Sequence, residues 1–104
     1  VPLFNLTLTL VSSQVQGSNT VYIFSATTAR DGFPLLCQVR YYVAMRNSTY
    51  SSSGPTTLDG SGTVQFILPN SLNGTAILIG IARAENLITS FDVLSFVHNI
   101  SQQS

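Results

Sequence analysis

The chain has 104 residues, of which 44% are hydrophobic and only 8% are charged, and its formal net charge is zero. This length predicts one domain with a single core between two packed layers. The four cationic residues are all arginine, too few for the basic patch that holds a nucleic-acid backbone. We therefore expect a protein that does not bind nucleic acid.

The first predicted element is a strand over residues 1–11. Phe4, Leu6, Leu8 and Leu10 alternate with polar side chains, and a period of two is typical of a strand with one buried face. The segment has none of the charges, lysines or bulges that normally block the pairing of an edge strand. We therefore separate an N-terminal strand, residues 1–13, from a β-sandwich domain, residues 14–104.

Further strands are predicted over residues 21–26, 35–45, 63–68, 75–84 and 90–98, from period-two alternation and enrichment in β-branched and aromatic residues. Turns are expected at residues 14–19, 30–34, 59–62 and 70–74. The serine-rich segment 47–58 is expected to hold loops and at most a short edge strand. Gly80, inside a strand, is expected to mark a close contact with a neighbouring sheet. The sequence thus predicts an all-β fold, an antiparallel immunoglobulin-like β-sandwich of six or seven strands.

Four tripeptides match the acceptor pattern for N-glycans, and they begin at Asn5, Asn47, Asn73 and Asn99. Each falls where the predicted strands and turns face solvent. The pattern favours a secreted glycoprotein at the cell surface. Covalent N-glycans are the only added groups we expect, and no cofactor is predicted.

Outward side chains of the strand over residues 35–45 and its end form a candidate contact face made by Arg40, Tyr42 and Arg46. Arginine and aromatic side chains are favoured where proteins contact other proteins or sugars. The alternative is an ordinary exposed sheet face on which the tyrosine covers apolar surface. Both interpretations remain open at this stage.

Residues suited to catalysis or metal binding are scarce. The only histidine, His98, is expected at an exposed strand end, and no Gly-x-Ser-x-Gly motif is present. The only cysteine, Cys37, is expected to be buried and inert, and one His with one Cys cannot supply a zinc site. Glu85 and Asp92 are interpreted as ordinary loop and strand residues. We expect neither an enzyme nor a metal site.

No membrane span is expected, because the longest apolar stretch, residues 76–82, is far shorter than the ~20 residues that cross a bilayer. The chain begins with Val1 rather than Met. We interpret it as a mature form or an excised domain, with any membrane anchor left behind.

Residues 30–84 contain three segments that resemble transthyretin-like and immunoglobulin-like surface modules. They are residues 31–41, with DGFPL followed by VRY, residues 57–69 (TLDGSGTVQFILP), and residues 73–76 (NGTA). With the glycan acceptors and the absence of lysine, the chain resembles archaeal cell-surface β-sandwiches, including thread or pilus subunits assembled by donor-strand exchange. It lacks the long apolar N-terminal helix of type IV pilins. The resemblance implies a fold more specifically than an activity.

Two functions follow as expectations. In the first, Phe4, Leu6, Leu8 and Leu10 insert into the next subunit as a donor strand and build a surface filament, pilus-like and suited to adhesion, by self-association into a homopolymer. In the second, the strand completes its own sandwich, and the chain is a monomeric extracellular module that recognises carbohydrate or protein through the Arg40 and Tyr42 face.

Overall fold

The computed structural model describes residues 4–56, 60–84 and 89–98, and these residues form eight strands and no helix. β1 (Asn5–Gln16), β2 (Asn19–Arg30), β3 (Phe33–Pro34) and β6 (Ser61–Pro69) make one sheet, in which β2 pairs with the other three. The second sheet has the order β5-β4-β7-β8, from β4 (Gln38–Met45), β5 (Ser48–Pro55), β7 (Gly74–Arg83) and β8 (Ser90–His98). All pairings are antiparallel.

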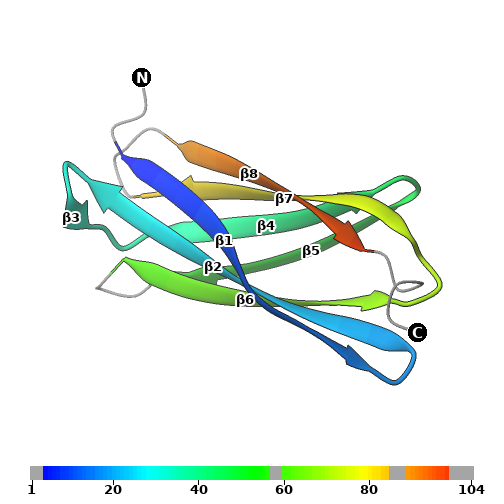
Figure 1. Cartoon of the computed structure of the whole chain (residues 1–104). Helices are drawn as coiled ribbons and strands as arrows, with labels where there is room; N and C mark the ends of the chain where they lie inside the picture. The colour runs from blue at the N-terminus through cyan, green and yellow to red at the C-terminus, as the bar shows by residue number, and fades with distance from the viewer. Residues whose placement is uncertain (1–3, 57–59, 85–88, 99–104) are drawn as a thin grey trace.

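The two sheets pack face to face, in an elongated body of 46 × 23 × 18 Å (Figure 1). The inward row of each strand fills the space between them, as the alternation predicts. In β4 this row is Val39, Tyr41 and Val43, and in β6 it is Val64, Phe66 and Leu68. The predicted all-β antiparallel sandwich is confirmed. The described residues have eight strands rather than six or seven, because β3 was not predicted and the segment of β5 was expected to hold at most a short edge strand.

β5 is the largest departure from the predicted elements. Residues 48–55 form a complete strand that pairs with β4 along its length, although their composition indicated loops. Composition misleads here because the partner strand β4 supplies the hydrogen bonds, whatever the intrinsic preference of serine.

The predicted strand 35–45 begins later than expected, at Gln38. Just before this strand, backbone N–H groups of residues 35 and 37 are hydrogen-bonded to two buried threonines, Thr28 and Thr56. The Leu35 N–H donates to the Thr28 carbonyl at 3.1 Å, and the Cys37 N–H donates to Thr56 Oγ1 at 2.8 Å. These bonds hold residues 35–37 outside the regular ladder, so strand pairing starts after them.

Cys37 is buried and free, as predicted. Burial raises the pKa of its thiol, and the hydrogen bond from Thr28 opposes this only in part. Burial also raises the pKa of Tyr22 and of Tyr41. All three side chains are therefore held in their neutral forms by the core.

β1 pairs with β2 of its own chain along its length. Phe4, Leu6 and Leu8 are buried in the core, and the terminal methyl groups of Leu8 lie over Gly80 in the opposite sheet. A Cβ at Gly80 would lie 3.0 Å from both of these methyl carbons. The predicted close contact at Gly80 is thus confirmed, and its partner is β1.

Three predictions for this segment are wrong. Leu10 was placed in the buried row but is 43% exposed, because β1 leaves the core from Thr9 onward, just before the register shifts between Leu10 and Ser12. That shift is a bulge, which the strand was expected to lack. The turn predicted over residues 14–19 shrinks to residues 17 and 18, since β1 continues to Gln16 and the β1–β2 hairpin projects past the sandwich (Figure 1).

Candidate functional site

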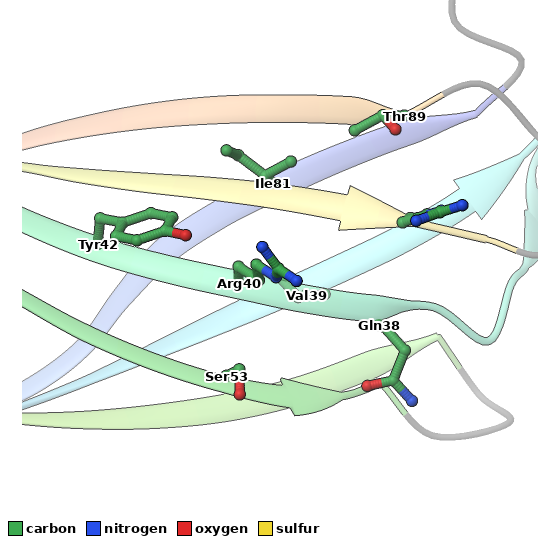
Figure 2. Close-up of a pocket in the computed structure, with 8 residues that line it drawn as sticks. Gln38, Val39, Arg40, Tyr42, Ser53, Ile81 and Thr89 are labelled. Carbon is green, nitrogen blue, oxygen red and sulfur yellow. The ribbon is translucent and has the colours of Figure 1, made fainter.

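A hollow of about 520 Å³ lies on the outer face of the β5-β4-β7-β8 sheet. β4 supplies Gln38, Val39, Arg40 and Tyr42, and Ser53, Ile81, Arg83 and Thr89 complete the lining. Figure 2 shows Arg40 and Tyr42 of β4 between Ser53 of β5 and Ile81 of β7. We call this hollow the Arg40 cavity. Its volume falls within the range of about 300–1,000 Å³ that is usual for small-molecule sites.

Strand register explains how the Arg40 cavity forms. Arg40 is paired with Ile81 on one side and with Ser53 on the other, and Tyr42 is paired with Ser51. Short serine side chains on β5 thus stand beside long side chains on β4, which leaves empty space between them. A second hollow of about 250 Å³ lies over these serines, so Arg40 and Tyr42 form the ridge between two depressions.

The charged side chains that line the Arg40 cavity are both positive. Because Gln38 pairs with Arg83, Arg40 and Arg83 are diagonal neighbours on the same face, a relationship that separates positions by about 7–8 Å. Both side chains are exposed, and neither forms an ion pair with a carboxylate in the described parts of the chain. Two of the four cationic residues therefore lie on this face without a compensating carboxylate from the described residues.

The predicted contact face is changed by the structure. Arg40 and Tyr42 line the cavity, whereas Arg46 lies in the turn between β4 and β5 and is not part of the lining. Arg83, Gln38, Ser53 and Thr89 were not identified from the sequence. The one available signal was that Arg83 shares its side of the strand with Ile81, because the two are two residues apart.

Exposed apolar side chains adjoin this region along β7 and β8. The group consists of Ile77, Ile81, Phe91, Val93 and Val97. Ile81 pairs with Phe91, so one end of this group borders the Arg40 cavity directly. An exposed apolar group beside polar side chains is typical of interaction surfaces.

His98 is buried, with 1% of its surface exposed, so the expectation of an exposed histidine is wrong. Its Nδ1 lies 2.6 Å from the Tyr22 hydroxyl, and its Nε2 lies 2.8 Å from the Pro69 carbonyl oxygen. Since a carbonyl only accepts, Nε2 carries the proton and Nδ1 accepts from Tyr22. Both nitrogens are thus engaged within the core, which gives the ring a structural role.

Among the described residues, no group of three or more His, Cys, Asp and Glu side chains could hold a metal ion. Asp92, one candidate carboxylate, accepts a hydrogen bond of 2.9 Å from the Leu8 backbone N–H. Glu85 lies outside the described residues.

Three glycan-acceptor asparagines can be placed. Asn5, Asn47 and Asn73 are exposed, and Asn99 lies outside the described residues. Asn47 follows β4 and Asn73 precedes β7, so both lie at the end of the sheet where Ala44 pairs with Ile77. The Arg40 cavity is at the other end of the same strands, where Gln38 pairs with Arg83. Asn5 begins β1 in the opposite sheet. Sugars attached at Asn47 and Asn73 would thus start from the opposite end of the sheet.

Comparison with known proteins finds no matching family model and no similar curated protein. Among solved structures, β-glucosidase 3B from Thermotoga neapolitana in complex with α-D-glucose is similar over 94% of this chain, at 11% identity and a TM-score of 0.46. A glucose complex of β-glucosidase from Kluyveromyces marxianus is similar over 88%, at 12% identity and a TM-score of 0.42. This chain spans 16% and 14% of those proteins. Neither likeness carries an argument about function.

The described residues include no helix of the length and hydropathy needed to cross a bilayer.

Proposed function

We propose that this chain is a non-catalytic, N-glycosylated extracellular module that recognises carbohydrate or protein through the outer face of the β5-β4-β7-β8 sheet. The observation that carries the proposal is the Arg40 cavity, in which Arg40, Tyr42 and Arg83 surround an open hollow. Arginine and tyrosine are enriched among the residues that dominate binding energy. The face holds two of the few charges in the chain without a compensating carboxylate from the described residues.

The surroundings of the cavity support binding rather than catalysis. The only histidine is held in the core by Tyr22 and Pro69, away from solvent. A general base must reach the proton that it removes, and a buried ring with both nitrogens engaged does not. The exposed acceptor asparagines lie away from the cavity, which is consistent with a glycoprotein whose working face stays uncovered.

Screening the purified full chain against an array of immobilised oligosaccharides and against cell-surface protein extracts tests this proposal. We expect saturable binding that Tyr42→Ala weakens at least tenfold, because the ring is the largest apolar contact in the cavity. Phe33→Ala is the matched control, since Phe33 is an exposed aromatic residue of the other sheet. Equal loss in both variants, or no loss in Tyr42→Ala, would reject this face as the binding site.

A second proposal is a surface filament built by donor-strand exchange through β1. It is favoured by the position of β1 at a sheet edge and by its uncharged, partly apolar sequence. Exchange would require β1 to leave its own core and the hairpin at residues 17 and 18 to open. Asn70 opposes that opening, because its backbone N–H donates to the Ser18 carbonyl at 2.8 Å and its Nδ2 donates to the Gly17 carbonyl at 3.1 Å.

The two proposals differ in the assembly state that they require. Light scattering after size exclusion, with electron microscopy of concentrated full chain, would reveal head-to-tail polymers if strands are exchanged. A filament that is lost on Leu8→Ala but retained on Leu10→Ala would support exchange, since only Leu8 is buried in the core groove. A chain that stays monomeric at all concentrations would rule out the filament, and only the proposal of a binding module would remain.

A further inference from the structure

We infer that the Arg40 cavity takes an acidic oligosaccharide, a sugar chain that carries a carboxylate, with Arg40 and Arg83 holding the carboxylate and Tyr42 lying against a sugar ring. This inference rests on the proposed binding function and names its ligand class.

Two guanidinium groups, those of Arg40 and Arg83, belong to the lining of the Arg40 cavity. Arg40 and Arg83 are diagonal neighbours on one face in a chain with only four cationic residues, and two like charges on one face repel each other. The described carboxylates give no relief, because Asp92 is turned to the Leu8 backbone and Asp31 lies beyond the end of β2. A bound anion would supply the missing negative charge.

Two arginine side chains favour a planar anion. The planar fork of an arginine matches a carboxylate with two parallel hydrogen bonds. Two forks on one face would hold a single carboxylate from two sides. A nucleic acid is disfavoured because the cavity offers only two cations and no further basic surface continues from them: Arg30 is in the other sheet, and Arg46 is in the turn between β4 and β5.

The remaining lining of the Arg40 cavity combines apolar and polar side chains. Tyr42 and Ile81 present apolar surface next to the guanidinium groups, whereas Gln38, Ser53 and Thr89 present amide and hydroxyl groups. A sugar ring has the same combination, with C–H groups on its faces and hydroxyls at its edge. An isolated inorganic anion would use the arginines alone and leave the other side chains without a partner.

Isothermal titration of the full chain with oligogalacturonate and with its methyl ester tests the inference, because esterification removes the negative charge and adds only a methyl group to each carboxyl. We expect the ester to bind at least about tenfold more weakly than the acid, as a charge-assisted contact is lost. Arg40→Gln and Arg83→Gln should each weaken the acid by a similar factor and leave the ester unchanged. Arg30→Gln, an exposed arginine of the other sheet, should bind as the unchanged protein does.

Three results would overturn the inference. Equal affinity for acid and ester would show that the arginines do not select charge, and the proposed binding face would stand if Tyr42→Ala still weakened both. Sulfate that binds as tightly as the oligosaccharide would show a simple anion site. No binding of either sugar, with fold confirmed by near-ultraviolet circular dichroism, would exclude this ligand class, and the array screen would then decide the proposed function separately.

Discussion

The contact between Leu8 and Gly80 provides a test of whether β1 packs into the core of its own chain. Gly80→Ala would place a methyl group 3.0 Å from two carbons of Leu8 and 3.2 Å from a methyl carbon of Leu6. These atoms are the ends of flexible side chains, so they yield without moving the backbone. Overpacking of this kind typically costs about 1–3 kcal/mol, and we expect the lower half of that range.

Leu8→Ala acts on the same contact in the opposite direction. Leu8 is buried between the sheets, and truncating a buried leucine to alanine typically costs about 2–5 kcal/mol. In the double variant the added methyl of position 80 enters the space that Leu8 vacates. We therefore expect the double variant to lose less stability than the sum of the two single losses, with a coupling of about 0.5–3 kcal/mol.

Urea unfolding of the four proteins, followed by circular dichroism, measures this coupling. Leu10→Ala is the matched control, because Leu10 of the same strand is 43% exposed, and surface changes usually lie within about 0.5 kcal/mol. Additive costs for Leu8 and Gly80, or a cost at Leu10 as large as at Leu8, would refute the placement of β1. A midpoint that rises with protein concentration would indicate that β1 is contributed by a neighbour.

Three further predictions concern the stability of the core. Gly60→Ala should destabilise by about 2 kcal/mol or more, because φ is +77° and a Cβ would overlap the Thr28 carbonyl oxygen, whereas Gly54→Ala has open space and should unfold at nearly the same urea concentration. Tyr22→Phe should cost about 1–3 kcal/mol by leaving Nδ1 of His98 buried without a donor, as measured by thermal unfolding. Burial raises the pKa of the buried tyrosine and cysteine side chains, so the unfolded chain loses their protons first. The urea midpoint should therefore be unaffected by these groups at neutral pH and fall as the pH rises above about 9–10, and a midpoint that rises there would contradict this.

Most of the core could be predicted from alternation alone. The rows through Val39, Tyr41 and Val43 and through Val64, Phe66 and Leu68 are buried as expected, because each strand has one face that must leave water. Alternation failed where the environment changed along a strand. Leu10 continues the pattern of Phe4, Leu6 and Leu8 but lies just before the bulge, in the part of β1 that is exposed from Thr9 onward.

The candidate site was only half predictable for a different reason. Arg40 and Tyr42 share one strand, so their common face follows from a period of two. Arg83 joins them through the register between β4 and β7, which pairs Gln38 with Arg83. That register depends on pairing between strands that are distant in the sequence, and the sequence of a single strand does not reveal it. His98 was misplaced for the same reason, since its partners Tyr22 and Pro69 are distant in the sequence.

The edge of β1 illustrates why a strand must be judged with its neighbours. By its own sequence β1 has no charge to block further pairing, but Asp92 of β8 supplies one by accepting the Leu8 N–H that faces away from β2. Because β8 lies at the edge of the second sheet, this bond links the two sheets where an added strand would otherwise dock. The bulge beyond Leu10 and the bonds from Asn70 to the hairpin restrain the rest of β1. With this edge occupied from within the chain, the stronger basis for a partner is the pair of arginines of the Arg40 cavity, which no described carboxylate neutralises.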